Sequence, residues 1–325
     1  MKKTLLPVLL TLCISSLGQK THPVPVIFDT DIGPDYDDVG ALAMLHAFAD
    51  FGEARILATI SSNAFETTAP TLSVLNTYFR RGDIPIGVTK TLFPNKACSQ
   101  GWAQVIIQKY PHSIHSNQTA EDAVPLYRRI LSVQPDSTVT IISTGFFTNL
   151  AHLLESQPDQ YSSLNGKELV SLKVKQLVSM AARLDKDSIE GYEFNVMVDP
   201  QASKKVFGEW PTPITLSGFE IGQKILTGIK LINNEEIQNS PVKDAFRIAL
   251  EKDNNSLGRN SWDETAVLVA IRGIGPWFES TKINFKIDDD GKNVLVPGDR
   301  FIYLRFRESP EEIGRLMEDL MMHHP

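Results

Sequence analysis

The sequence predicts an α/β protein with an open, mostly parallel sheet and helices on both faces. Short strand-like runs alternate with longer helical stretches along the 325 residues, and the strand-like runs are almost continuously apolar. No Ser/Gly-rich linker or charge block interrupts this alternation. Strands that are apolar on both sides need helices on both sides of the sheet. In such folds ligands bind at the carboxyl ends of the strands.

Local composition places the elements in order. The expected strands are the short β-rich runs at 24–29, 56–61, 84–88, 138–143, 176–180 and 214–217. The expected helices lie between and after them, at 37–50, 68–80, 120–132, 148–156, 199–207, 242–251, 263–273 and 311–321. Several of these helices begin at Asp or Thr, which suit a helix N-terminus. Asp199 and Pro200 form the clearest start, with Asp at the N-cap and Pro at the first helical position. We expect residues 19–325 to form one domain.

Composition excludes several classes of protein. The chain has 32 Lys and Arg against 39 Asp and Glu, a net charge of −7. This balance argues against a nucleic-acid partner, because such proteins need a basic face to neutralise phosphates. Two cysteines are too few for a disulfide scaffold. No apolar stretch is long enough for a membrane span of about 20 residues.

The N-terminus resembles a cleavable secretory signal peptide. Lys2 and Lys3 precede a mainly apolar stretch at 5–14, and small residues at Ser16 and Gly18 suit a cut after residue 18. We therefore expect residues 1–18 to be a signal peptide and the mature protein to be periplasmic or secreted. A lipoprotein attached through Cys13 and a retained anchor are the alternatives. Cleavage leaves Cys98 as the single cysteine, which we expect to be buried rather than catalytic.

Five aspartates crowd into residues 29–38, directly after the first expected strand. Two carboxylates 4 Å apart repel by about 4 kcal/mol at an effective dielectric of 20, and this segment contains no Lys or Arg. A hard cation such as Ca²⁺, which takes oxygen ligands, would compensate the charge. The alternative is a set of helix caps, in which Asp35, Asp37 and Asp38 complement the start of the helix at 37–50. An EF-hand does not fit, because the twelfth position from Asp29 is Gly40.

The chain resembles the inosine–uridine-preferring nucleoside hydrolase family. The resemblance is carried by five segments, which follow the family's order: Asp29-Thr30-Asp31-x-Gly with Asp37-Asp38, Ser62-Asn63, Gly145-x-x-Thr148-Asn149-Leu150-Ala151, Glu193-Phe194-Asn195 with Asp199-Pro200, and Trp262-Asp263-x-Thr265-Ala266. Each segment alone is weak, but the ordered set is specific. The resemblance implies an open, Rossmann-related α/β sheet.

The resemblance also implies a function and its residues. The family hydrolyses the N-glycosidic bond of ribonucleosides, with a Ca²⁺ ion at the floor of the pocket. Carried over by position, the metal ligands would be Asp31, Asp38, Asp263 and the carbonyl of Thr148, with Asp31 also the general base. Asp37, Asn63, Glu193 and Asn195 would hold sugar hydroxyls, and Asp35 has no clear family role. The partner would be a small nucleoside or riboside, and the family often forms homo-oligomers.

The leaving-group half of the site departs from the family pattern. Trp262 stands where purine-cleaving members often carry a proton-donating His, and we expect it to contact the substrate. Three functions therefore stay open: a ribonucleoside hydrolase, a hydrolase of another ribosylated small molecule, and a Ca²⁺-dependent sugar-binding protein without turnover. Simpler interpretations also exist, since Thr148 and Asn149 suit a helix cap, and Glu193 and Asn195 suit an ordinary loop after a strand.

Overall fold

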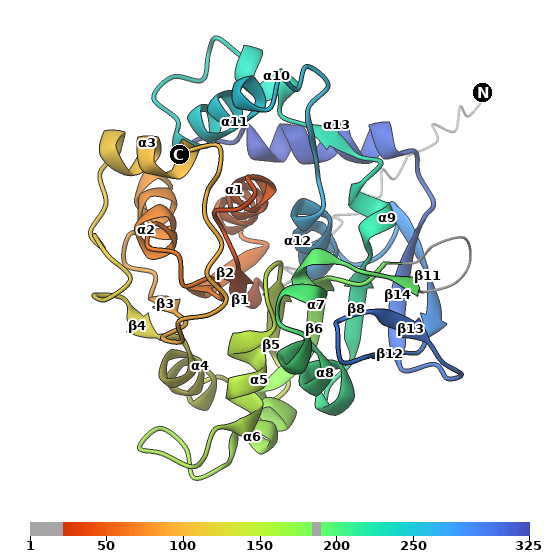
Figure 1. Ribbon diagram of the computed structural model, residues 1–325. Helices are drawn as coiled ribbons and strands as arrows, with labels where there is room; N and C mark the ends of the chain where they lie inside the picture. The colour runs from red at the N-terminus through yellow and green to blue at the C-terminus, as the bar shows by residue number, and fades with distance from the viewer. Residues whose placement is uncertain (1–21, 184–189) are drawn as a thin grey trace, which may run out of the picture.

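The computed structural model describes residues 22–183 and 190–325. Within this part of the chain, the central feature is a nine-stranded sheet in the order β11-β14-β8-β6-β5-β1-β2-β3-β4 (Figure 1). Its strands are β1 (Val24–Thr30), β2 (Ala54–Ser61), β3 (Ile86–Val88), β4 (Glu121–Asp122), β5 (Val139–Ser143), β6 (Val174–Met180), β8 (Ile214–Ser217), β11 (Phe278–Ile283) and β14 (Phe301–Phe306). Every neighbouring pair is parallel except β11 with β14.

The chain reverses its direction across the sheet at β1. It runs outward from β1 through β2 and β3 to β4, then returns to place β5 on the other side of β1. Asp29 of β1 lies opposite Ser143 of β5, and Ser143 lies opposite Ser179 of β6. The segments that follow these strands therefore emerge side by side. A crevice at such a switch point is the usual ligand site of an open α/β sheet.

Helices cover both faces of the sheet, as the sequence predicts (Figure 1). One apolar core forms with α1 (Asp37–Asp50), α2 (Thr68–Tyr78), α3 (Trp102–Lys109), α11 (Pro241–Lys252), α12 (Asp263–Arg272) and α13 (Pro310–Met321). The other forms with α4 (Ala123–Ser132), α5 (Thr148–Glu155), α6 (Gly166–Lys173) and α8 (Pro200–Glu209). Helix α1 is buried almost all round, which explains why its sequence after the first turn is apolar except for His46 and the final Asp50. It is thus held firmly beneath the acidic segment that precedes it.

Several small elements lie outside the central sheet. They include β7 (Glu190–Gly191), which pairs with β13 (Asn293–Leu295), and β13 in turn pairs with β12 (Phe285–Ile287). A second small pair joins β9 (Leu226–Thr227) to β10 (Arg259–Asn260). The short helices are α7 (Phe194–Val198), α9 (Phe219–Gly222) and α10 (Ile229–Asn233). The sequence reading missed these elements, and β11 and β14 as well.

Two further expectations concern Cys98 and the N-terminal segment. Cys98 is buried and forms no disulfide among the described residues, which confirms the prediction that it is buried. Among the described residues, no helix has the length and apolar character needed to cross a bilayer. The predicted signal peptide at 1–18, with Cys13, lies outside the described residues and stays a prediction.

Candidate active site

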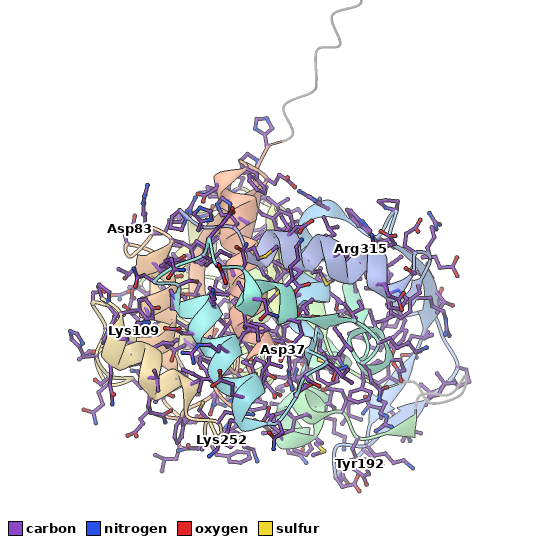
Figure 2. The ribbon with its side chains drawn as sticks, turned by 90° about the horizontal axis from the view of Figure 1, so that it is seen from above. Asp37, Asp83, Lys109, Tyr192, Lys252 and Arg315 are labelled. Atoms are coloured by element: carbon purple, nitrogen blue, oxygen red, sulfur yellow. The ribbon has the colours of Figure 1, made fainter. Side chains whose placement is uncertain are left out.

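A cavity opens where the carboxyl ends of β1, β5 and β6 meet. Its volume is about 430 Å³, including the space at its mouth. It is lined by carboxylates on one side and by apolar side chains on the other: Asp31, Asp35, Asp37, Asp38, Thr144, Met180, Glu193, Phe194, Asn195, Phe219, Trp262 and Asp263. In Figure 2, Asp37 is labelled near the middle of the view and Tyr192 near its lower edge. Asp37 is 2% exposed, so the acidic side of the cavity is buried.

The acidic residues predicted from the sequence converge at the floor of this cavity. Asp31 follows β1, Asp37 and Asp38 begin α1, and Asp263 begins α12. Asp37, Asp38 and Asp263 each offer one ligand atom, and these atoms lie within 4.8 Å of one another. Because 225 residues separate Asp38 from Asp263 in sequence, only the packing of α1 against α12 brings them together.

Burial and mutual repulsion raise the pKa values of these carboxylates. Burial, with the nearby Asp37, raises the pKa of Asp38 to about 8. Burial raises the pKa of Asp31 well above its usual range, and repulsion from Asp38 adds to this. Asp263 behaves in the same way, with its pKa raised first by burial and then by Asp37 and Asp38. A bound cation would reverse the repulsive part of these shifts.

Asp38 shows most clearly that the floor fits a cation. Its Oδ1 accepts a hydrogen bond from the Thr30 hydroxyl and lies 3.4 Å from the Thr144 hydroxyl. Its Oδ2 is buried and has no hydrogen-bond partner among the described residues. A buried carboxylate oxygen without a partner is costly. Several carboxylate oxygens facing one another form the donor set that hard divalent cations prefer.

Arg259 supplies a positive charge that the sequence reading missed. Its guanidinium donates two hydrogen bonds to Asp37 Oδ1, at 2.8 and 3.0 Å, and forms an ion pair with Asp35 at 2.6 Å. The acidic segment itself contains no Lys or Arg, but Arg259, which is 222 residues from Asp37 and beyond any local motif, compensates part of its charge. Asp35, which has no clear family role and which the sequence left open as a metal ligand or a helix cap, is the more exposed partner of this guanidinium.

The structure places a different threonine at the cavity from the one expected to offer its carbonyl to the metal. Thr148 does not line the cavity; it begins α5, and its hydroxyl donates to Asp199 at 2.5 Å. Thr144 lies at the cavity instead, directly after β5. Its carbonyl accepts a hydrogen bond from Asn195 at 3.3 Å. The reason is geometric, since four residues of turn separate the end of the strand from the helix. The Gly-x-x-Thr-Asn motif marks this turn but not its cavity-facing residue.

Asn63 supports the site from behind rather than facing the cavity. Its side-chain amide donates to the carbonyls of Asp31, at 3.0 Å, and Lys96, at 2.8 Å, and its oxygen accepts from the backbone of Lys96 and Phe65. It is fully buried and does not line the cavity. The structure therefore does not place Asn63 where a sugar hydroxyl would reach it. It holds the backbone of Asp31 in position instead.

Glu193 and Asn195 do line the cavity, as the sequence predicts. The Glu193 carboxylate accepts backbone hydrogen bonds from Asn195 and Val196, so it also caps α7. Burial raises the pKa of Glu193 to about 7. The Asn195 amide donates to the carbonyls of Thr144 and Met180. The pair is therefore fixed by the backbone of β5, β6 and α7.

An aromatic wall forms the other side of the cavity. Trp262 and Phe219 stack with ring centroids 5.3 Å apart and planes 28° apart. The Trp262 indole N–H donates to the Phe219 carbonyl at 2.8 Å, so it is already engaged. Phe194 and Met180 complete the apolar lining. Of these residues, Trp262 was expected from the sequence to contact the substrate. Phe219 carries no local signal, because apolar residues in short loops usually signify packing.

The parallel sheet and the acidic cavity at its switch point define an α/β protein that can hold a cation and a small polar ligand. A family model described as inosine-uridine preferring nucleoside hydrolase matches residues 26–308. The chain belongs to this family, which confirms the resemblance drawn from its motifs.

Individual relatives agree with this assignment. The chain is 27% identical over 207 residues to the pyrimidine-specific ribonucleoside hydrolase RihA of Escherichia coli, a match that covers 62% of each protein. Among solved structures, the purine-preferring ribonucleoside hydrolase from Gardnerella vaginalis superposes with a TM-score of 0.70 at 16% identity, over 91% of this chain and 98% of that one. The inosine-uridine preferring nucleoside hydrolase from Bacillus anthracis gives 0.69 at 16% identity, over 92% and 99%. At these identities the structural likeness shows the fold.

Proposed function

We propose that this protein is an N-glycosyl hydrolase that splits ribonucleosides into ribose and a free base, with a divalent cation, Ca²⁺ first among the candidates. The observation that carries the proposal is the convergence of Asp31, Asp38 and Asp263 at the cavity floor, where one Asp38 oxygen is buried and has no hydrogen-bond partner in the described part of the chain. Family membership and the names of the relatives support the same activity.

The residues that would hold the cation are the carboxylates of Asp31, Asp38 and Asp263, with the carbonyl of Thr144 as a further oxygen. All of them line the cavity. An all-oxygen set suits Ca²⁺ better than softer metals. When bound, such a cation supplies positive charge that attracts sugar hydroxyls and makes water easier to deprotonate.

The chain's own residues divide the remaining work. Asp31 takes a proton from the attacking water, whose oxygen bonds to C1′ of the ribose while the C1′–N bond breaks and its electron pair leaves with the base. The floor carboxylates stabilise the positive charge that develops on the sugar. Glu193 and Asn195 hold sugar hydroxyls in place. Asp37 acts mainly by binding Arg259, and this ion pair holds the carboxylates of the cavity floor in position.

The way in which the base leaves bears on the choice between a hydrolase and its alternatives. The Trp262 N–H is bound to the Phe219 carbonyl, so it does not serve as a proton donor. This observation favours ribosides whose base leaves without protonation by the protein. It also keeps a second candidate open, a cation-dependent sugar-binding protein that does not turn over. A predicted signal peptide at 1–18 would place either protein in the periplasm or outside the cell.

The test is a ribose-release assay on residues 19–325 with a panel of purine and pyrimidine ribonucleosides. The assay is run with Ca²⁺ and then with excess chelator. We expect release that the chelator abolishes and that added Ca²⁺ restores. Ribose binding without release from any nucleoside would favour the sugar-binding protein. Release that is indifferent to the chelator would contradict the role of the cation.

A further inference from the structure

Carboxylates dominate the lining of the cavity. Six of its twelve lining residues are acidic, namely Asp31, Asp35, Asp37, Asp38, Glu193 and Asp263, and none of the twelve is Lys, Arg or His. Two guanidiniums adjoin the lining from behind: Arg259 pairs with Asp35 and Asp37, and Arg183 packs on the Phe219 ring. With a divalent cation, these groups supply four positive charges against the six carboxylates. Among the described residues, acidic groups therefore prevail at the cavity.

Part of this negative charge lies toward the mouth of the cavity. The Asp35 side chain is 40% exposed, against 3% for Asp37, so Asp35 is the lining carboxylate nearer the solvent. Asp35 and Asp37 share the single positive charge of Arg259, which leaves the three groups negative together. Because the floor holds the sugar in the proposed function, the base extends away from the floor. Asp35 is then the carboxylate placed to act on the charge of the base.

The uncharged hydrogen-bond donors of the lining are already engaged. The Trp262 indole N–H donates to a backbone carbonyl, and the Asn195 amide donates to two others. The Thr144 hydroxyl donates to Asp38 Oδ1 at 3.4 Å. A neutral base that takes the electron pair of the broken C1′–N bond becomes an anion unless it gains a proton. Such an anion meets carboxylates here and no free uncharged donor among the described lining residues.

We propose that the preferred substrates are ribosides whose base carries a positive charge, such as N-ribosylpyridinium compounds and 7-alkylated purine ribosides, and that Asp35 contributes to their selection. The proposal rests on the proposed riboside hydrolysis and names the class of base. Water bonds to C1′ through its oxygen and gives a proton to Asp31, while the C1′–N bond breaks. Its electron pair neutralises the cationic ring, so the base leaves uncharged and needs no proton. The acidic lining attracts the charged substrate more than the neutral product.

The experiment compares ribosides that differ mainly in charge. Guanosine is paired with 7-methylguanosine, at a pH at which the methylated compound is a cation, and kcat and KM are measured with Ca²⁺. Enzyme-free rates are subtracted, because cationic ribosides also hydrolyse unaided. The variants are Asp35→Asn, which removes the charge, and Asp35→Glu, which keeps it.

Glu53→Gln is the matched control for Asp35→Asn. Glu53 also pairs with an arginine, Arg272, at 2.7 and 2.8 Å, and Arg272 also packs over an aromatic ring, at 4.8 Å from the centre of Phe48. Glu53 does not line the cavity. The control therefore breaks a similar ion pair without changing the charge of the cavity.

We expect the wild type to prefer 7-methylguanosine over guanosine by about tenfold or more in kcat/KM. Asp35→Asn should lower this ratio about threefold, mainly through the KM of the cationic substrate. Asp35→Glu should keep most of the preference, and Glu53→Gln should match the wild type. A ratio near one would overturn the proposal. A preference that Asp35→Asn leaves unchanged would also overturn it, since the preference would then reflect the reactivity of the substrate alone.

A binding measurement separates failure of this proposal from failure of the proposed hydrolysis. If guanosine and uridine are cleaved as fast as 7-methylguanosine, only the specificity proposal is wrong. If no riboside is cleaved, the proposed hydrolysis is wrong, and calorimetry compares nicotinamide riboside with its uncharged dihydro form. Tighter binding of the cation that weakens in Asp35→Asn supports selection by charge. Equal binding of the two forms, or binding that the substitution does not change, overturns it.

Discussion

Asp31 is the residue whose chemistry depends most on its surroundings. It is 4% exposed and carries a raised pKa, first because of burial and then because Asp38 lies nearby. A general base must be ionised to accept a proton, so a neutral Asp31 would be inactive. A cation beside Asp38 and Asp263 would restore its charge. In the proposed mechanism, the need for a cation and the role of Asp31 as the base would thus both follow from the same buried cluster.

The corresponding prediction is that Asp31→Asn abolishes turnover while ribose binding persists. Asparagine keeps the shape of the side chain but does not accept the proton from water, so kcat should fall by about 10²- to 10⁴-fold. Steady-state ribose release measures the loss, and calorimetry with ribose and Ca²⁺ measures the remaining binding. Activity within a factor of two of the wild type would remove Asp31 as the base.

Arg259 gives a second prediction at the residue scale. Replacing it with Gln leaves Asp37, which is 2% exposed, without its partner. Breaking a buried ion pair costs about 3 kcal/mol of unfolding free energy. Arg259→Lys should lose less, since it keeps the charge but gives up the stacking on Tyr36 and Trp262. Urea unfolding in chelator gives the values.

The control for Arg259 is Arg315→Gln, which breaks an exposed pair with Glu312 on α13. Exposed pairs of this kind contribute about 0 to 1 kcal/mol. If Arg259→Gln were no more destabilising than Arg315→Gln, the pairing of Arg259 with Asp37 would contribute no more to the free energy of unfolding than an exposed ion pair.

At the scale of elements, the turn from β5 to α5 holds two neighbouring strands at the correct distance. Asn149 donates to the Asp29 carboxylate at 3.2 Å and to the Ser61 carbonyl at 3.0 Å, which joins α5 to the ends of β1 and β2. Gly145 packs against the next turn, and a Cβ there would lie 2.3 Å from the backbone nitrogen of Asp31. The motif Gly-x-x-Thr-Asn therefore sets the position of Asp31 from a distance in sequence.

The prediction for this element is that Gly145→Ala destabilises the protein and weakens cation binding. Backbone is the nearest obstacle, so β1 or β5 must shift, at a cost of about 3 kcal/mol. The shift displaces Asp31. Thermal unfolding and Ca²⁺ titration measure the two effects in one variant.

Gly208→Ala in α8 is the matched control. A Cβ at Gly208 meets nothing within 4 Å, and alanine in a helix is more stable than glycine by about 0.5 to 1 kcal/mol. The control should therefore be slightly stabilised and bind Ca²⁺ normally. Normal Ca²⁺ affinity in Gly145→Ala would show that this turn does not position the floor.

For the whole molecule, the buried acids link stability to pH. Burial raises the pKa of Asp29 to about 7 and that of Asp38 to about 8, against 3.8 for an ordinary aspartate. At pH values between 3.8 and these raised pKa values, the folded protein binds more protons than the unfolded chain. The stabilisation is fully present below about pH 4 and is lost as the pH rises through 7 to 8. Asp31 and Asp263 shift in the same direction.

The expected result is a melting temperature that falls from about pH 5.5 to about pH 8.5 in chelator, and falls less in Ca²⁺. A cation at the floor would compensate the negative charge of Asp38. Asp29 accepts hydrogen bonds from Tyr127 and Asn149 instead, so its contribution to the pH dependence of stability should persist in Ca²⁺. Calorimetric scans in both conditions give the difference, which should grow with pH. A difference that stays constant across this range would contradict a cation at the ionising floor.

Local sequence predicted the framework of the molecule because its signals are short-range. The six expected strands correspond to β1, β2, β3, β5, β6 and β8, and the helix predicted at 37–50 is α1. The β11 and β14 strands were missed. Phe278–Ile283 carries exposed polar residues between its apolar ends, as suits the edge strand of the sheet, and Phe301–Phe306 lies next to it. Their pairing is decided by neighbours far away in the chain.

The sequence by itself determined the α/β class, the family motifs and the acidic cluster, because hydrophobic patterning and ordered motifs are written in consecutive residues. Only the tertiary structure decided which atoms meet. It placed Thr144 rather than Thr148 at the cavity, turned Asn63 toward the backbone, and joined Arg259 to Asp35 and Asp37. Charge compensation and cavity shape depend on distances of a few ångströms, and those distances are set by packing between elements that are remote in sequence.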